Sequence, residues 1–433
     1  MNLERLKKIM ADNGCTKVFV KPLAPNDNSK NQVYLGGSDI FNLFPMSEIT
    51  AESPGEWKRE RFKATSDFAW IGEDGQLFKA PNAQFILYPK YPEVRFSGFL
   101  AKCINAPSDL MTIRQAGRLL FLSVSNSGQI LGFVTAPDSG LAREFVNVPS
   151  QQEGIFRTFE LMKRDSKIIL MKELSRIYQL GWIPSKRLDK FGAVLDCNAP
   201  NCGGYTLEAE LGITPNGYSE PDFLGWEVKQ FGVTNLKKPG NAVITLMTPE
   251  PTEGLYVSEG VEYFIRHYGY PDQNGREDRL NFGGVHKSSI KHHRTSLTMQ
   301  LIGFDADSGK IKSAAGKIAL IDEQGNEAAA WSFAALLQHW NRKHNQACYI
   351  PSKSETGHLR RYCYGNLVTL GEETDFQLFL AQMHLGNIYY DPGIKMENIS
   401  VKPVVKRRSQ FRMSSQFLGS LYKRNEVVDV LMY

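Results

Sequence analysis

Residues 223–231 constrain the fold most, because their side chains alternate as in a half-buried β-strand. In a strand, successive side chains point to opposite faces. The apolar set that begins at Leu224 then faces a core, whereas Glu227 and Lys229 are neighbours on the other face. Asp222 lies where this strand begins. The alternation therefore predicts a strand that carries an acid and a base side by side.

This acid–base pair, together with Asp222, suits the hydrolysis of a phosphodiester. Asp222 and Glu227 are predicted to bind Mg²⁺, a hard ion that prefers oxygen ligands and keeps several waters. Bound Mg²⁺ neutralises developing charge and activates a water, and Lys229 is predicted to orient that water or to stabilise the transition state. Glu208, on an expected helix, is predicted to be a third catalytic carboxylate, either as a metal ligand or as the partner of Lys229. The alternative for the three residues alone is a surface strand with an ordinary salt bridge.

The same region resembles a known nuclease family. Pro221 and Asp222, followed by Glu227 and Lys229, resemble the PD-(D/E)xK nuclease signature. The flanking residues resemble the catalytic core of the MvaI/BcnI restriction endonucleases, which are similar in turn to the mismatch-repair nicking enzyme MutH. The segments that carry this resemblance are GYTLE at 204–208, LGI at 211–213, EPD at 220–222 and GWEVK at 225–229.

The resemblance extends from about residue 160 to the C-terminus and implies both a fold and an activity. The implied fold is α+β or α/β, with a restriction-endonuclease-like core in which helices flank a mixed central sheet. The implied activity is Mg²⁺-dependent cleavage of double-stranded DNA, with Mn²⁺ able to substitute, to give 5′-phosphate and 3′-hydroxyl ends. A role in restriction or anti-phage defence follows from the same resemblance.

A chain of 433 residues is too long for one ordinary core, so more than one domain is expected. We expect an N-terminal α+β domain at residues 1–150 and an endonuclease domain at 151–433, with a linker around 146–152. The first 150 residues resemble no family, and we expect them to recognise DNA or to regulate cleavage.

Local patterns predict individual elements in both domains. They are a helix over residues 3–14, a hairpin of 119–124 with 129–134, a helix over 155–180, a strand at 242–248 in the centre of a sheet, and helices around 333–340 and 374–386.

Several polar segments in the second half are expected to contact DNA. A basic run at 401–425 contains no acidic residue. Polar residues at alternate positions lie shortly before this run and in its first half. Arginine reads guanine and glutamine reads adenine in the major groove. A second cluster follows the Gly283-Gly284 loop and is expected to clamp the backbone. The predicted DNA-binding residues are His286, Lys287, Arg294, Tyr389, Asp391, Lys395, Arg408, Gln410 and Arg412. The alternative is plain phosphate binding or solvated charge.

Composition limits the remaining function classes. Six scattered cysteines are expected to be reduced thiols, and no apolar run approaches the roughly 18 residues that span a bilayer. A cytoplasmic protein without membrane contact is therefore expected. Two alternatives stay open beside the restriction enzyme. One is a nicking or modification-dependent nuclease whose N-terminal domain binds DNA or a protein partner of a defence system. The other is a DNA-binding protein that has lost catalysis.

Overall fold

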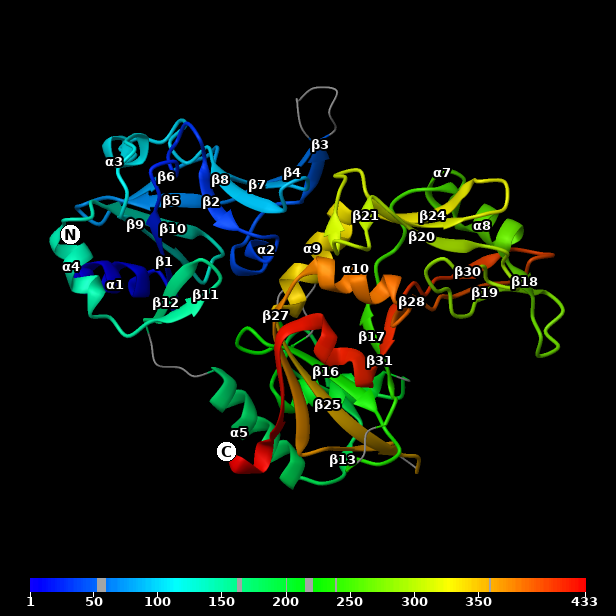
Figure 1. The fold of residues 1–433 in the computed structure, drawn as a ribbon. Coiled ribbons are helices and arrows are strands. Elements are labelled where there is room, and N and C mark those ends of the chain that lie inside the picture. Colours follow the sequence, from blue (N-terminus) through cyan, green and yellow to red (C-terminus); the bar gives the residue numbers. More distant parts are fainter. Residues whose placement is uncertain (53–59, 162–165, 200, 215–220, 238–239, 358–359) are drawn as a thin grey trace. The chain divides into compact units, whose positions relative to one another are not determined.

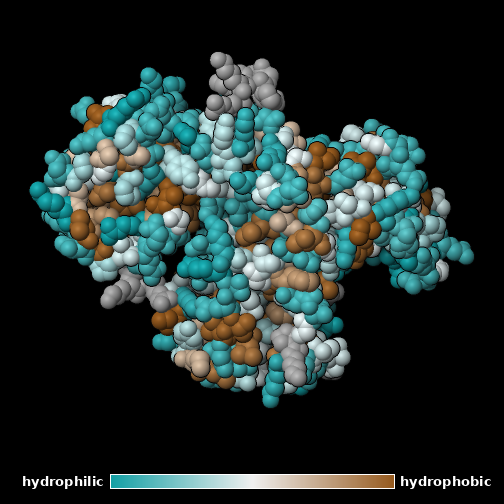
Figure 2. All heavy atoms as spheres, in the orientation of Figure 1, coloured by the Kyte–Doolittle hydropathy of each residue, from teal (hydrophilic) through white to brown (hydrophobic). Residues whose placement is uncertain are grey.

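The structure, a computed structural model, describes residues 1–433 except 53–59, 162–165, 200, 215–220, 238–239 and 358–359 (Figure 1). The chain divides into two compact units, Met1–Arg164 and Asp165–Tyr433. Glu220, part of the EPD segment, lies outside the described residues. None of the described helices is long and apolar enough to cross a membrane. On the face of the molecule shown in Figure 2, most side chains are hydrophilic and the apolar ones form small groups.

Two sheets make up most of the first unit. Their strand orders are β11-β12-β1-β9-β10-β5-β6 and β2-β8-β7-β4-β3. The strands of the first sheet are β1 (Lys17–Leu23), β5 (Phe68–Ile71), β6 (Leu77–Lys79), β9 (Arg118–Val124), β10 (Ile130–Thr135), β11 (Gln151–Glu153) and β12 (Phe156–Glu160). Those of the second are β2 (Val33–Gly36), β3 (Thr50–Glu52), β4 (Arg61–Thr65), β7 (Gln84–Tyr88) and β8 (Glu93–Ser97). The helices are α1 (Leu3–Asp12), α2 (Ile40–Leu43), α3 (Ser108–Thr112) and α4 (Gly140–Val146).

Both faces of the seven-stranded sheet are covered, which explains why its central strands are buried almost throughout. Helices α1 and α4 cover one face, where Leu6 and Phe145 join the same apolar cluster as Val20. The five-stranded sheet covers the other face, where the rings of Phe68 and Phe96 lie 5.0 Å apart. The predicted N-terminal helix and the predicted hairpin, now β9 and β10, are confirmed.

The boundary between the two units differs from the expected linker. Residues 151–153 form β11, which pairs with β12 and so belongs to the first unit. The helix predicted over 155–180 is therefore wrong in its first part, because Phe156 and Thr158 alternate into the sheet as a strand does. Helix α5 begins at Ser166, and residues 162–165 lie outside the described part of the chain.

The second unit is built on a mixed sheet with the order β13-β26-β25-β27-β32, and β16 pairs with β25. The β16–β25 pair is parallel and the other pairs are antiparallel. This agrees with the expected mixed α+β class. The strands are β13 (Ile183–Pro184), β16 (Glu227–Gly232), β25 (Gln346–Glu355), β26 (Arg361–Tyr364), β27 (Leu367–Thr374) and β32 (Tyr422–Asp429). The long helices are α5 (Ser166–Gln179), α6 (Cys202–Glu210), α8 (Gly260–Tyr268), α9 (Phe333–His344) and α10 (Phe376–His384).

Smaller sheets extend this unit, in the orders β17-β31-β28, β18-β19-β29-β30 and β20-β23-β24. The strand predicted at 242–248 is β17, which lies at the edge of its sheet rather than in the centre. The bounds are β17 (Val243–Met247), β18 (Tyr270–Pro271), β19 (Arg279–Gly283), β20 (Thr298–Ile302), β23 (Lys317–Ile321), β24 (Glu327–Ser332), β28 (Ile388–Tyr390), β29 (Gly393–Glu397), β30 (Val404–Lys406) and β31 (Phe411–Ser414). The remaining elements are hairpins β14 (Lys186–Leu188) with β15 (Val194–Asp196) and β21 (Phe304–Asp305) with β22 (Lys310–Ile311), α7 (Leu255–Ser258), and the 3₁₀ helices η1 (Ser415–Leu421) and η2 (Val430–Met432).

Helices α5 and α6 pack on one face of the mixed sheet. Leu174 and Leu207 from these helices share an apolar cluster with Val228 and Ile350 from the strands and with Trp226, which directly precedes β16. This core fixes α6, which carries Glu208, against β16, which carries Glu227 and Lys229.

A disulfide lies directly before and within α6. Cys197 and Cys202 are bonded, with their Cα atoms 5.8 Å apart. The expectation of reduced thiols is therefore wrong for these two, because the turn that leads into α6 brings them together. Of the described cysteines, Cys15, Cys103, Cys348 and Cys363 are free.

Candidate active site

A tight turn, rather than a strand, precedes the predicted acid–base pair. Phe223 and Trp226 form a bridge with hydrogen bonds of 2.9 Å in both directions. The two residues between them have positive φ, 47° at Leu224 and 90° at Gly225, as in the hairpin turns that match strand twist. The strand predicted over 223–231 therefore begins only at Glu227. Leu224 is 48% exposed instead of buried, whereas Trp226 faces the core as predicted.

Glu227 and Lys229 form an ion pair on the other face of β16. Lys229 Nζ lies 2.8 Å from Glu227 Oε1, and the Glu227 residue is only 3% exposed. Burial disfavours the charge on Lys229, but the charge of Glu227 and its hydrogen bond outweigh burial. The net effect is a raised pKa of Lys229. The ammonium is therefore fully charged at neutral pH.

Asp222 is held beside this pair by the backbone of β16. Its Oδ2 accepts a hydrogen bond of 3.1 Å from the amide of Val228, across the Leu224-Gly225 turn. The turn thus places a second carboxylate next to the start of the strand. Among the residues that the structure describes, no three His, Cys, Asp or Glu side chains gather into a metal-binding cluster.

A cleft of about 970 Å³ opens over this region. Glu208 from α6 and Lys229 from β16 both line it, so the structure brings these two predicted residues together. Asp222 and Glu227 are not among the described lining residues. Asp222 is hydrogen-bonded to Val228 and Glu227 is paired with Lys229, and both Val228 and Lys229 line the cleft. The cleft is thus lined by Lys229, and the carboxylates of Asp222 and Glu227 are bonded to residues that line it.

Two further cations line the same cleft and were missed by sequence reasoning. Lys353 comes from β25, the parallel neighbour of β16, and Arg360 precedes β26. Lys353 stands between two serines directly after the mostly apolar run 347–351, which was a weak signal of a polar surface. Together with Arg412 from β31, these cations give the cleft a positive wall that suits a phosphate backbone.

A buried polar layer supports the strand beneath the pair. Tyr349 lies directly beside Lys229 in the parallel register, and its hydroxyl lies 2.7 Å from that of Tyr422. Burial raises the pKa of Tyr349 to about 12, so it stays neutral. Burial and the charge of Lys229 lower the pKa of His344 to about 3. Tyr349 and His344 are therefore neutral and add no charge next to Lys229.

Part of the predicted DNA-reading segment lies at the same cleft, which we name the catalytic cleft after the candidate catalytic residues Glu208 and Lys229 that line it. Tyr389 in β28 pairs in register with Arg412 in β31, and Asp391 follows directly. Asp391 Oδ2 lies 2.6 Å from Arg412 Nη1, which fixes the guanidinium that lines the cleft. Three of the predicted DNA contacts are therefore brought together, and one of them faces the proposed substrate.

Two predicted contacts, His286 and Gln410, do not fit direct DNA contact because they are buried, at 0% and 7% exposure. Burial and the neighbouring His292 lower the pKa of His286 to about 3, so its ring is neutral. Its Nδ1 donates to the carbonyl of Gly284, and its Nε2 accepts from the hydroxyl of Thr295. His286 thus fixes its own loop.

The remaining predicted contacts lie elsewhere. Arg294, Lys395 and Arg408 line a second pocket, which is formed by the sheet β18-β19-β29-β30. Lys287 is exposed and lines neither cavity.

The family of the chain follows from its sequence. The sequence model of the MvaI/BcnI restriction endonuclease family matches residues 171–422, more than half of the chain. The protein belongs to the MvaI/BcnI restriction endonuclease family. It is a DNA endonuclease of the type II restriction kind. Members of this family generally use divalent metal ions.

Three solved structures match part of the chain. The restriction endonuclease MvaI with cognate DNA is 19% identical and covers 62% of this chain and 100% of its own, with a TM-score of 0.46. MvaI without DNA is 18% identical and covers 62% and 99%, with a TM-score of 0.34. The B3 domain of the restriction endonuclease UbaLAI with cognate DNA is 17% identical and covers 36% and 97%, with a TM-score of 0.24. No curated protein matches the sequence.

Proposed function

We propose that this endonuclease hydrolyses phosphodiester bonds of duplex DNA with Mg²⁺ bound by Asp222 and Glu227, in the manner of PD-(D/E)xK nucleases. The observation that carries the proposal is the 2.8 Å contact of Lys229 with Glu227 at the catalytic cleft, with Asp222 anchored to the same strand. The biological role that fits such an enzyme is restriction or anti-phage defence.

The donor set fits the metal. Mg²⁺ is commonly bound by one or two carboxylates and completes its shell with waters and substrate phosphate. Asp222 and Glu227 supply carboxylate oxygens at the start of one strand, and Glu208 lines the cleft as a third carboxylate. When bound, the ion lowers the pKa of a coordinated water and offsets charge on the phosphate.

The chain's own residues then position the reactants. Lys229 stays protonated, because its interactions with Glu227 raise its pKa, and can donate hydrogen bonds to the attacking water or to a phosphate oxygen. Water adds to phosphorus while the bond to the 3′ oxygen breaks and that oxygen takes up a proton. The products are a 5′-phosphate and a 3′-hydroxyl.

Cleavage by the full-length protein is expected to require a divalent ion. Supercoiled plasmid should stay intact with a chelator, and Mg²⁺ or Mn²⁺ should restore cutting, because the two carboxylates supply no nucleophile by themselves. Linear product indicates restriction-type cleavage and nicked product indicates a nicking enzyme. End-labelling of the fragments reports the 5′-phosphate. Full activity in chelator would contradict the assignment of Asp222 and Glu227.

We further propose that Arg412 reads the target sequence. Its guanidinium faces the cleft and is held by Asp391, and a fixed guanidinium can donate two hydrogen bonds to guanine. Tyr389, its register partner, shares this surface. Arg412 is therefore the favoured member of the predicted reading set.

The first unit is proposed to recognise DNA or a protein that controls cleavage. It is a compact unit with its own apolar core, and the residues proposed to be catalytic belong to the other unit. Residues 1–164, produced alone, are expected to bind duplex DNA in a mobility-shift assay with unmodified and methylated probes. A preference for methylated probe would indicate a modification-dependent nuclease. No shift with any probe would leave a protein partner or a structural role.

A further inference from the structure

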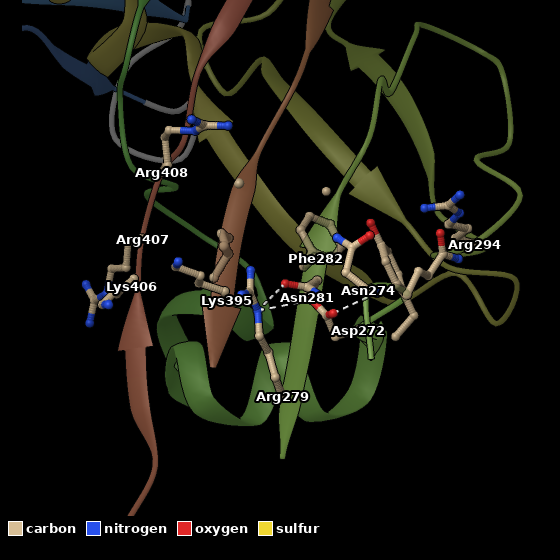
Figure 3. Close-up of a pocket in the computed structure, with 15 residues that line it drawn as sticks. Asp272, Asn274, Arg279, Asn281, Phe282, Arg294, Lys395, Lys406, Arg407 and Arg408 are labelled. Atoms are coloured by element: carbon tan, nitrogen blue, oxygen red, sulfur yellow. Dashed lines mark hydrogen bonds and ion pairs between the residues drawn. The ribbon is translucent and has the colours of Figure 1, made fainter. Parts of the chain in front are cut away.

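A second pocket, of about 500 Å³, lies on the sheet β18-β19-β29-β30 and shares no lining residue with the catalytic cleft. Six cationic side chains from four stretches of the chain line it, as Figure 3 shows: Arg279, Arg294, Lys395, Lys406, Arg407 and Arg408. Among the described residues, its lining includes only one carboxylate, that of Asp272. The pocket therefore has a strong excess of positive charge.

Two glycines that face each other in neighbouring strands make room for one of these cations, Arg408. Gly283 and Gly393 lie opposite each other in the β19–β29 register, so neither strand places a side chain at this point. A Cβ on Gly393 would lie 2.6 Å from Arg408 Nε, so only glycine lets this guanidinium rest against the strand. The backbone amide of Gly393 also donates to the carbonyl of Arg408, at 2.8 Å.

Some of these cations are fixed by contacts within the sheet. Arg279 Nε donates to Asn281 Oδ1 at 2.9 Å and lies 3.4 Å from Asp272 Oδ2. Glu397, which is not among the described lining residues, forms ion pairs with Arg279, Lys395 and Lys406. These contacts orient one side of the pocket before any ligand binds.

Three arginines complete the pocket without such partners. Arg294 lies over the ring of Tyr270, with its guanidinium carbon 5.3 Å from the ring centre. Within the described part of the chain, no ion pair involves Arg294, Arg407 or Arg408. Guanidinium groups bind phosphate oxygens in pairs of parallel hydrogen bonds, so the ligand chemistry that fits is a phosphate.

The position of the pocket along the chain indicates which kind of phosphate group it binds. Arg408 of the pocket and Arg412 of the catalytic cleft are four residues apart. An extended chain spans at most about 14 Å over four residues, which equals the rise of about four base pairs. One duplex can therefore reach both sites.

We propose that this pocket binds the phosphate backbone of the substrate duplex a few base pairs from the scissile bond. The inference rests on the DNA endonuclease activity described above and extends it to a second contact surface. Backbone contacts fix the register of the protein on DNA and carry no sequence information. The pocket therefore contributes affinity equally for target and unrelated DNA.

Salt-dependent binding tests this in the full-length protein without metal. The double variant R294A/R408A is expected to bind a target duplex and an unrelated duplex at least about tenfold more weakly. The slope of log affinity against log salt is expected to become shallower by about 2, because each lost phosphate contact removes about 0.9. The charge-retaining variant R294K/R408K is expected to keep the slope. The control R266A/K312A removes exposed cations that line neither cavity and is expected to match wild type.

Other outcomes distinguish a site for the DNA backbone from a site for a free anion. A wild-type slope in R294A/R408A would overturn the inference, as would a loss confined to the target duplex. Inorganic phosphate, titrated calorimetrically, is the probe for a free-anion site. Phosphate binding that the double variant abolishes, together with a wild-type salt slope for DNA in that variant, would favour that source and overturn the inference. Absence of all DNA binding by the wild type would instead contradict the endonuclease assignment.

Discussion

The double variant Glu227→Gln/Lys229→Met is expected to cleave DNA at least about a thousandfold more slowly than wild type. The glutamine removes a carboxylate proposed to hold the metal, and the methionine removes the charge proposed to act on water or phosphate. Both side chains are close in size to the originals. Changing them together also avoids leaving one buried charge without its partner, which would destabilise the fold by itself.

Binding and cleavage measured separately isolate the chemical step. Single-turnover cleavage of a labelled duplex gives the rate, and fluorescence anisotropy without metal gives the affinity, which is expected to stay within severalfold. The matched control Glu262→Gln/Arg266→Met removes an exposed ion pair on α8 and is expected to leave both unchanged. Mg²⁺-dependent cutting by the double variant at more than a tenth of the wild-type rate would rule out this pair as catalytic.

The local part of the site could be predicted because it depends on short-range periodicity. A period of two correctly placed Trp226 in the core and Glu227 with Lys229 on the opposite face. The same period failed at Leu224, since alternation continues through a two-residue turn whose positive φ values leave little trace in the sequence beyond Gly225. The motif therefore indicated the residues of the candidate site but not the turn that positions Asp222.

The surroundings of the site depend on contacts between distant segments and could not be predicted in the same way. Lys353 reaches the catalytic cleft because β25 pairs with β16, more than a hundred residues earlier in the chain. Burial is equally non-local. His286 and Gln410 have the polarity of DNA-reading residues, yet each lies beneath neighbouring segments. The sequence shows polarity, whereas only the packed fold shows which polar groups remain accessible.

The first unit gives the clearest case of a polar residue whose role the sequence did not reveal. Arg118 begins β9 and is 0% exposed. Its guanidinium donates to four backbone carbonyls, at 2.7 Å for Gln115, 2.9 Å for Asp27, 3.2 Å for Ala24, and closely for Leu110. One side chain thus joins the loop after β1 to the segment that leads into β9.

Replacing Arg118 with methionine is expected to destabilise the first unit by about 3 kcal/mol or more. Methionine fills much of the space but leaves four carbonyls without their donor, and an unpaired buried polar group costs about 1–3 kcal/mol. In calorimetry of the full-length protein, the transition of the first unit should fall by roughly 6–12 °C, at about 2–4 °C per kcal/mol for a unit of this size. The transition of the second unit should stay in place.

Two further variants show that the donors, rather than the length or charge of the side chain, account for this loss. Arg118→Lys keeps the charge but presents a single ammonium that cannot reach carbonyls in separate segments, so it is expected to be nearly as unstable as the methionine variant. Arg114→Met, at an exposed position four residues earlier, is expected to change stability by less than about 0.5 kcal/mol. A lysine variant as stable as wild type would mean that charge alone suffices. The network of four carbonyls would then not be what holds these loops to β9.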